Sequence, residues 1–263
     1  MLNKNIIMKH FSQASTEYDK YANVQKKMAV KLSAMLNDRH SFENILEIGC
    51  GTGCLTKIIA QQFPTAHILA TDISESMLKT AKDNLSLYPN IQFKVMDGEN
   101  IHTNDKYDLI ISNAAFQWFS DYNKAFKGFY SCLKKRGILI YATFGKNTFV
   151  ELHKSFAYAY DKNNFSGYPN NHQFISIQNL TELCKHNKFE STFKTADYIE
   201  YFKTVRDFLK SVKKIGANNA SSHSCFIRKK IMLNMLSYYQ KNFCYNNKIY
   251  ATYNVIYGIN KKI

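Results

Sequence analysis

Five short runs rich in β-branched and other apolar residues recur between residues 44 and 144, and stretches with helical spacing separate most of them. Such alternation is the pattern of repeated βαβ units, whose parallel strands need helices on both faces of the sheet. The sequence therefore predicts an α/β protein with a mostly parallel sheet covered on both faces. The expected strands are NILEIG, AHILATD, IQFKVMD, YDLIISN and GILIYATF.

The stretches between these runs predict helices over 52–62, 75–85 and 121–135, each with apolar residues near helical spacing. Gly137 follows three basic residues, Lys134 to Arg136, which is a typical end of a helix. We therefore expect the third helix to stop there and the fifth strand to begin.

The regular alternation of expected strands and helices ends at Gly145. Helices are expected over 148–160, 177–187, 205–215 and 226–242, and strands over 193–202 and 249–259. Two further strands would complete a seven-stranded sheet as an antiparallel pair at one edge, with a helical lid inserted before these last two strands. No Gly/Ser-rich linker divides the chain. We expect one structural domain in three segments, a helical cover (1–36), a binding core (37–145) and the lid with its edge strands (146–263).

The segment LEIGCGTG, residues 46–53, ends the first strand in a glycine-rich turn that leads directly into a helix. Glycines at alternate positions allow a sharp turn and close approach of a ligand at the strand ends. A dinucleotide fingerprint, G-x-G-x-x-G, needs a glycine where this chain has Cys54. The spacing is instead G-x-G-x-G, preceded two residues earlier by the acid Glu47.

This pattern resembles motif I of the seven-strand S-adenosylmethionine-dependent methyltransferases, which have a Rossmann-like fold. The resemblance implies S-adenosylmethionine as cofactor, with polar residues at successive strand ends meeting its ribose, adenine and methionine parts. A solvated strand-end carboxylate is the alternative for any single acid, but four suitable strand ends in order favour the methyltransferase. The implied cofactor-binding residues are Glu47, Gly49, Cys50, Gly51, Gly53, Asp72, Ile73, Met77, Asp97, Gly98 and Asn113.

Four segments make the resemblance more specific. Residues 10–26, HFSQASTEYDKYANVQK, and residues 112–118, SNAAFQW, are similar to segments of the malonyl-acyl-carrier-protein O-methyltransferases of biotin synthesis. Gly216-Ala217-Asn218 and Ala251-Thr252-Tyr253 also look like that family. The SNAxxQW block is shared with trans-aconitate and other small-acid methyltransferases, so a different small carboxylic acid or a quinone precursor remains an alternative substrate.

The resemblance implies methyl transfer to the free carboxylate of a malonyl thioester on acyl-carrier protein. A carboxylate is already ionised at neutral pH, so the reaction needs no general base. Tyr18 is the candidate catalytic residue, a hydroxyl donor to that carboxylate, although a packing role in a helix is its simpler interpretation. The candidate substrate-binding residues are Phe116, Gln117, Trp118, Lys213 and Lys214, and a solvated helix face is the alternative for each lysine.

The net charge of +15 is concentrated after Gly145, where 18 Lys and Arg stand against 7 Asp and Glu. An excess of positive charge on the lid favours an acidic partner, here the carrier protein. The alternative explanation of this excess is a coding bias toward lysine. Nucleic acid is not an expected partner, because basic runs are short and no base-flipping N-P-P-Y motif occurs. A non-catalytic member of the fold is a third possibility.

Six cysteines occur without a CxxC pair, and the first residues lack the apolar stretch of a signal peptide. No window is apolar and long enough to cross a bilayer. We therefore expect a cytoplasmic protein with no membrane partner. The histidines lack metal-ligand spacing, so no metal site is expected.

Overall fold

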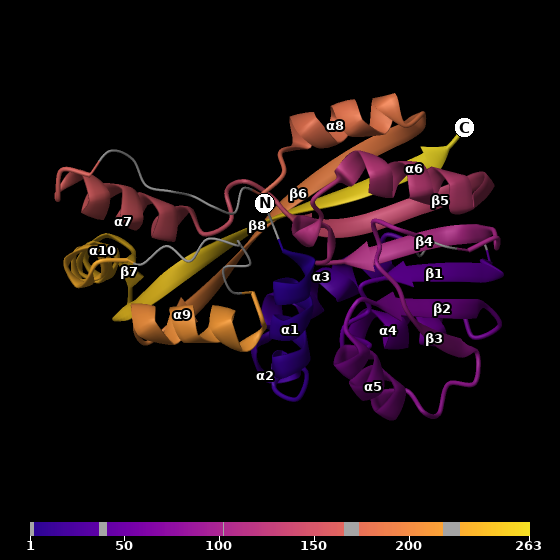
Figure 1. Cartoon of the computed structure of the whole chain (residues 1–263), viewed down its shortest axis with the longest axis horizontal. Helices are drawn as coiled ribbons and strands as arrows, with labels where there is room; N and C mark the ends of the chain where they lie inside the picture. The colour runs from indigo at the N-terminus through magenta and orange to yellow at the C-terminus, as the bar shows by residue number, and fades with distance from the viewer. Residues whose placement is uncertain (1–2, 37–40, 102, 166–173, 218–226) are drawn as a thin grey trace.

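The computed structural model describes residues 3–36, 41–101, 103–165, 174–217 and 227–263. Five parallel strands form its centre, and their carboxyl ends point toward the middle of the molecule in Figure 1. The sheet order is β3-β2-β1-β4-β5-β8-β6. The parallel strands are β1 (Asn44–Ile48), β2 (His67–Asp72), β3 (Ile91–Val95), β4 (Tyr107–Asn113) and β5 (Leu133–Phe144).

Helices cover both faces of the sheet, as predicted. Side chains alternate along β1, so Ile45 belongs to the core on one face and Leu46 to the core on the other. The first core includes α3 (Asn23–Ala34), α4 (Cys54–Gln62) and α5 (Glu75–Asn84), and the second includes α6 (Tyr122–Cys132) and α8 (Ile177–His186).

The last strands form the predicted antiparallel pair at the sheet edge. β8 (Lys248–Lys262) pairs with β5, and β6 (Phe189–Phe202) pairs with β8. The sheet has eight strands rather than seven, because Cys244–Tyr245 forms β7, a short partner of β8. The turn between them has Asn246 and Asn247 at φ 48° and 59°, values that asparagine tolerates in tight hairpins.

The predicted helix stop at Gly137 is wrong. Helix α6 ends at Cys132, and Leu133 already has extended backbone and pairs with Tyr107 of β4. The positive φ in this part of β5 belongs to Arg136, at 65°. Gly137 serves a different purpose, because a Cβ there would lie 2.9 Å from the carbonyl oxygen of Lys134.

The lid contains fewer helices than expected. Both edge strands extend past the carboxyl ends of the parallel strands, and α7 (Val150–Asp161), α9 (Val205–Lys214) and α10 (Lys229–Asn242) gather around this extension (Figure 1). Helix α8 instead packs on α6 and β6. The expected start of the fourth of these helices, residue 226, and Asn218 of the Gly-Ala-Asn segment lie outside the described residues.

The amino-terminal segment is helical, with α1 (Lys4–Ala14) and α2 (Tyr18–Tyr21) preceding α3. Asn3 caps α1 by accepting from the backbone N–H groups of Asn5 and Ile6. Helix α1 packs beside α5, and α2 beside α9 of the lid. No helix of the described part of the chain meets the length and hydropathy needed for a membrane span.

Candidate functional site

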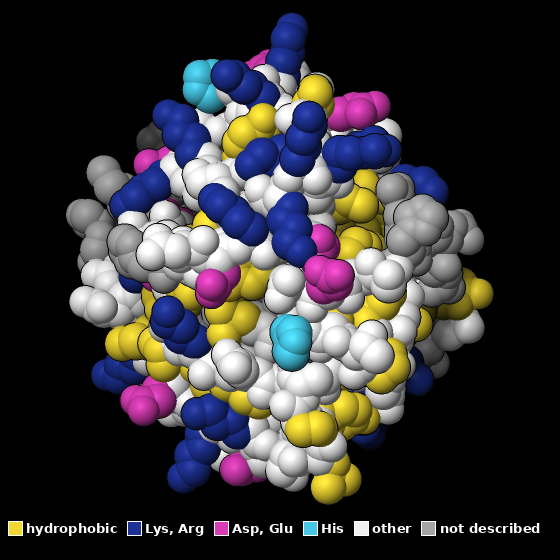
Figure 2. Space-filling view, turned by 90° about the vertical axis from the view of Figure 1, so that its right-hand side faces the viewer, with side chains coloured by type: hydrophobic (Ala, Val, Ile, Leu, Met, Phe, Trp, Pro, Cys, Tyr) yellow, Lys and Arg dark blue, Asp and Glu magenta, His cyan; other side chains and the backbone are white. Residues whose placement is uncertain are grey.

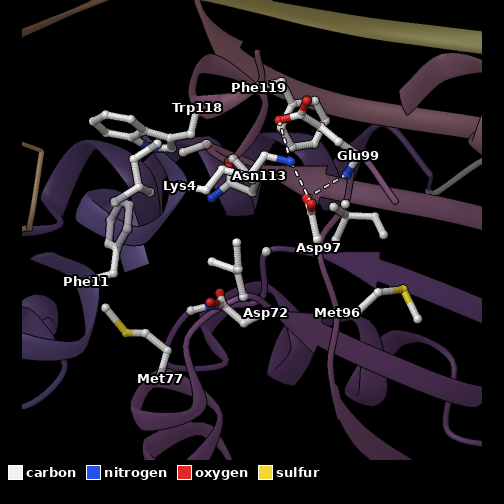
Figure 3. A pocket seen from close by; sticks show the side chains of 18 of the residues that line it. Lys4, Phe11, Asp72, Met77, Met96, Asp97, Glu99, Asn113, Trp118 and Phe119 are labelled. Carbon is white, nitrogen blue, oxygen red and sulfur yellow. Dashed lines mark hydrogen bonds and ion pairs between the residues drawn. The ribbon is translucent and has the colours of Figure 1, made fainter. Parts of the chain in front are cut away.

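Two adjoining pockets open at the carboxyl ends of β1 to β4. The large pocket includes Lys4, Phe11, Asp72, Met77, Asp97 and Trp118 (Figure 3). The small pocket includes Asp19, Lys26, Glu47 and Cys54. Tyr18, Gly49, Gly51 and Asn113 line both pockets, so they mark where the two meet.

The glycine loop adopts a conformation that few other residues tolerate. Gly49, Gly51 and Gly53 have φ values of 72°, 54° and 91°. A Cβ on Gly49 would lie 2.5 Å from the Cβ of Ala115, so backbone and pocket wall approach closely there. Gly53 faces away from both pockets, and a Cβ there would meet Leu85 at 2.7 Å. It permits packing rather than lining the site.

Asp72 ends β2 with its carboxylate held by backbone donors. Gly51 N–H donates to Oδ2 at 2.9 Å, and Ser74 N–H donates to Oδ1 at 2.8 Å. Burial raises the pKa of Asp72 despite these hydrogen bonds. Ile73 and Met77 also line the large pocket, so the structure brings this predicted group together.

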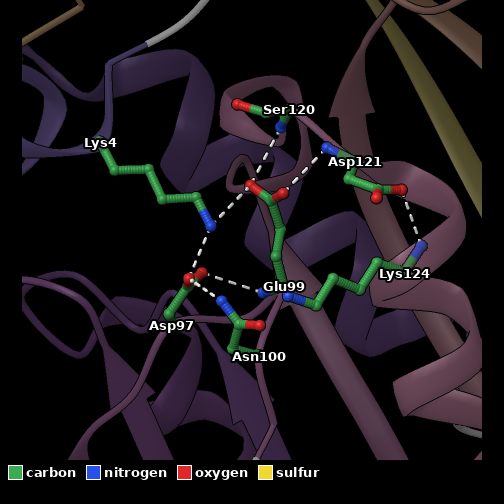
Figure 4. A network of polar contacts seen from close by, with 7 residues as sticks. All are labelled: Lys4, Asp97, Glu99, Asn100, Ser120, Asp121 and Lys124. Carbon is green, nitrogen blue, oxygen red and sulfur yellow. Dashed lines mark hydrogen bonds and ion pairs between the residues drawn. The ribbon is translucent and has the colours of Figure 1, made fainter.

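A charged network closes the far end of the large pocket (Figure 4). Lys4 Nζ lies 2.6 Å from Asp97 Oδ2 and 3.1 Å from Glu99 Oε1. Burial opposes ionisation of Asp97, but hydrogen bonds from Lys4, Glu99 N–H and Asn100 outweigh it and lower the pKa of this carboxyl. The backbone N–H groups of Ser120 and Asp121 donate to Glu99.

Sequence reasoning placed Asp97 and Gly98 in the site but missed Lys4 and Glu99. Both line the large pocket with them. The spacing of an acid two residues after Asp97 was a weak signal for Glu99. Lys4 had none, because its contact spans 93 positions of the chain.

The small pocket contains two polar oxygens that have no partner among the described residues, Glu47 Oε2 and Asn113 Oδ1. Asn113 Nδ2 donates to the carbonyl of Gln25 at 3.0 Å, which leaves its oxygen as the free acceptor. Glu47 is only 1% exposed. Burial raises the pKa of Glu47 to about 7 against the opposing effect of the Thr56 hydroxyl, and Asp72 adds a smaller increase. Cys50 lines the same pocket.

Tyr18 stands at the junction of the two pockets, at the start of α2. Burial raises the pKa of Tyr18 well above its usual value, and the nearby Asp72 and Asp19 raise it further. The hydroxyl therefore stays protonated at neutral pH and can donate. Thr52 Oγ1 of the glycine loop donates to Asp19 Oδ1 at 2.8 Å, which fixes the residue next to Tyr18.

The predicted aromatic segment divides between the pocket and the core. Trp118 lines the large pocket, with its ring 5.4 Å from that of Phe11 in an edge-to-face arrangement. Phe116 is fully buried among core aromatic rings. Gln117 donates to the carbonyl of Ala114 and accepts from Thr143. Phe116 and Gln117 thus lie behind the pocket wall.

Lys213 and Lys214 line neither pocket. Lys214 of α9 forms an ion pair with Glu17, which precedes α2. The pair raises the pKa of Lys214 and lowers that of Glu17. Gly216 presses against the backbone of His10, where a Cβ would lie 3.1 Å from the carbonyl oxygen. These contacts link the lid to the amino-terminal helices, and a direct substrate role for the two lysines stays a prediction.

Within the described part of the chain, no cluster of three or more His, Cys, Asp or Glu side chains is arranged to hold a metal ion. The polar side chains that line the two pockets are carboxylates, amides, lysines, a threonine, two cysteines and one tyrosine.

Comparison with solved structures assigns the fold. The YcgJ protein of Bacillus subtilis superimposes with a TM-score of 0.64 at 15% identity, covering 90% of this chain and 98% of that one. A phosphoethanolamine N-methyltransferase 2 of Haemonchus contortus, solved with S-adenosylhomocysteine, gives 0.55 at 16% identity, covering 90% and 52%. A family model described as a methyltransferase domain matches residues 45–137. The chain therefore has the Rossmann-like fold of these structures, and residues 45–137 match the methyltransferase domain.

Sequence comparison is more specific. The malonyl-[acyl-carrier protein] O-methyltransferase of Bacillus anthracis is 38% identical over 261 residues, covering 98% of this chain and 97% of that protein. The chain belongs to the malonyl-[acyl-carrier protein] O-methyltransferase family.

Proposed function

We propose that the protein transfers a methyl group from S-adenosylmethionine to the free carboxylate of a malonyl thioester on acyl-carrier protein. The observation that supports this best is the pair of pockets meeting at Tyr18, in a chain of this family. The methyl ester would disguise the dicarboxylate, so that fatty-acid synthesis can elongate it toward pimelate and biotin.

The residues present fit the cofactor. Asp72 would accept from the ribose hydroxyls and Asp97 from the adenine amino group, with Ile73 and Met77 against the ring. The unpartnered oxygens of Glu47 and Asn113 suit the ammonium of the amino-acid tail. When bound, S-adenosylmethionine supplies an electrophilic methyl group on its sulfonium.

With adenosine in the large pocket and the amino-acid tail in the small one, the reacting centre falls at their junction. Tyr18 lies there as a neutral hydroxyl that would donate to one carboxylate oxygen and orient the other. Trp118 and Phe11 cover the adjacent wall and exclude water. Because a malonyl carboxylate is already ionised, positioning and desolvation account for catalysis without a base.

The carrier protein would dock on the lid. Arg206, Lys210 and Lys213 are exposed at helical spacing on α9, beside α2 and the site. Lysines and arginines also gather at the opposite end of the sheet (Figure 2), so the basic side chains are not confined to the lid. Only the surface on α9 is next to the pockets.

Methyl transfer to malonyl-carrier protein, malonyl coenzyme A and free malonate, assayed side by side, tests the proposal. We expect the carrier-protein substrate to react best and its rate to fall with added salt, since salt screens exposed charges. Equal activity on free malonate would contradict carrier recognition, and activity only on another small acid or a quinone precursor would favour those alternatives.

A matched pair of triple variants tests the docking surface. Replacing Arg206, Lys210 and Lys213 by alanine should raise KM for malonyl-carrier protein roughly 3- to 30-fold, because exposed pairs each contribute up to about 1 kcal/mol. Replacing three exposed lysines of the opposite end, Lys135, Lys185 and Lys188, should leave KM unchanged. Equal effects of the two triple variants would exclude a specific surface on α9.

A further inference from the structure

A cavity at the amino ends of β1, β4 and β5 lies at the opposite end of the sheet from the two pockets. Its lining includes the apolar side chains of Phe42 and Ile138 and three cations, Lys135, Arg136 and Lys261. The volume of this amino-end cavity is about 480 Å³, within the range of small-ligand sites. Lysines and arginines gather over this end of the molecule (Figure 2), and the proposed function uses none of them.

The pairing of β4 with β5 explains how two of these cations reach the cavity. Between successive pairs, β4 advances two residues, from Tyr107 to Leu109, while β5 advances five, from Leu133 to Ile138. The intervening residues of β5, 134–137, therefore bulge out of the ladder. Bulges redirect side chains at the ends of sheets, and this one places consecutive cations in the lining of the cavity.

Arg136 adopts a backbone conformation that costs stability. Its φ of 65° lies in the left-handed region, which glycine adopts far more readily than residues with a Cβ. Within the described part of the chain, its guanidinium has no hydrogen bond, ion pair or ring contact. No internal contact of the side chain offsets the cost, which points to a partner outside the chain.

The three cations have no acidic partners among the described residues. Asp108, the acid in the lining, already accepts from two backbone N–H groups and from Lys134 at 3.0 Å. Glu190 lies opposite Lys261 in the ladder of β6 and β8, yet no ion pair between described residues includes it or any of the three cations. The cavity therefore presents positive charge that a bound anion can neutralise.

We propose that the amino-end cavity binds a small anion with two adjacent phosphate groups, a diphosphate. Arg136 would donate to one phosphate through two N–H groups, because the planar guanidinium matches phosphate geometry, and Lys135 and Lys261 would contact the anion as point charges. Three cations around one cavity match an anion with several charges better than a single carboxylate. The cavity shares no lining residue with the two pockets, so this site is independent of the proposed methyl transfer.

Calorimetric titration with pyrophosphate, phosphate and sulfate, at constant ionic strength, tests the ligand class. Pyrophosphate should bind saturably at one site and at least about tenfold more tightly than either single anion, because it adds a second charge-assisted contact. ADP, titrated with S-adenosylhomocysteine present to fill the adenosine pocket, shows whether the diphosphate of a nucleotide is accepted as well as the free anion. Failure of both diphosphates to saturate, or sulfate binding as tightly as pyrophosphate, overturns the proposal.

Arg136→Gly separates binding from folding, because it removes the cation and also relieves the positive φ. It should weaken pyrophosphate binding about 5- to 10-fold, the loss expected for one charge-assisted contact that is partly exposed. Lys185→Met is the matched control, because Lys185 is an exposed lysine at the same end of the sheet and does not line the cavity. This control should bind pyrophosphate as the wild type does. Equal weakening in both variants would show diffuse attraction by a basic surface and would exclude the site.

Discussion

The proposed contact between Glu47 and the cofactor ammonium should make cofactor affinity depend on pH. Its carboxyl is 1% exposed and burial raises its pKa to about 7, so in the free protein it is half protonated near neutrality. The ammonium of the cofactor favours the ionised form. Binding should therefore release a proton from Glu47 below pH 7 and become stronger as pH rises.

The size of the effect follows from the pKa. Ionisation of Glu47 falls from about half at pH 7 to about 3% at pH 5.5, so the affinity for S-adenosylhomocysteine should fall about 15-fold, or roughly 1.6 kcal/mol. Near pH 6 about 0.9 proton should be released on binding. Measurements should stay at or below pH 7.5, where the ligand's own amino group keeps its proton.

Calorimetry in buffers of different ionisation enthalpy measures both quantities. Glu47→Gln should bind S-adenosylhomocysteine more weakly, with an affinity that depends little on pH. Any dependence on pH that remains in this variant would come from Asp72, because burial raises the pKa of Asp72 as well. A wild-type affinity that stays constant between pH 5.5 and 7, in folded protein, would refute the reasoning. The reasoning would also be refuted if the affinity of Glu47→Gln depended on pH as strongly as that of the wild type.

The same group affects stability with a definite sign. Its folded pKa lies above the unfolded value, so the folded state binds more protons between about pH 4.5 and 7. Without cofactor, this group should make the free energy of unfolding fall as pH rises through that window, by up to about 3 kcal/mol. Bound S-adenosylhomocysteine should make the free energy of unfolding fall less with pH, because the ligand stabilises the ionised form of Glu47.

Three further perturbations have defined outcomes. Asp72→Ala should abolish calorimetric binding of S-adenosylhomocysteine, with retained circular dichroism as the control. Arg136→Gly should raise the free energy of urea unfolding by about 0.5 kcal/mol, since it relieves a positive φ, whereas Lys135→Gly in the same strand should lower it by about 1 kcal/mol. Lys4→Met should lower the free energy of urea unfolding by about 1 kcal/mol, because Lys4 bridges two carboxylates and its side chain is only 31% exposed. The loss should be smaller at high salt, which screens these charges. The control Lys9→Met should leave the free energy of unfolding unchanged.

The strand ends were predictable because their signals are local. A β-branched run, the glycines at 49, 51 and 53, and Asp72 after the second run are all readable within a few residues. The end of α6 was missed for the same reason: the basic residues and Gly137 look like a helix stop, but pairing of Leu133 with Tyr107 decides where the strand begins. Tertiary pairing overrode the local pattern.

The walls of the site were harder to predict. Phe116, Gln117 and Trp118 are consecutive, and nothing in their spacing says that only Trp118 lines the large pocket. The place of Lys213 and Lys214 in the lid, just before the Gly-Ala-Asn segment, suggests contact with the substrate, whereas Lys214 forms an ion pair with Glu17. Such side-chain directions depend on how the lid packs. The division into segments 1–36, 37–145 and 146–263 and the roles of individual site residues stay predictions.

The amino-terminal helices contact each of the four strand ends that would hold the cofactor. Lys4 contacts the loop after β3, Ser12 hydrogen-bonds Ser74 after β2, Asp19 accepts from Thr52 after β1, and Gln25 accepts from Asn113 at the end of β4.

The same segment contributes Tyr18, the proposed donor to the acceptor carboxylate. The position of Tyr18 is therefore fixed by the loops that would bind the cofactor, because its own helix and both flanking helices are bonded to them. Cofactor binding and assembly of the acceptor site are then coupled through these contacts, since any ligand that stabilises the loops stabilises the helices attached to them. This connection would let a single segment, distant in sequence from the glycine motif, combine residues for cofactor and substrate.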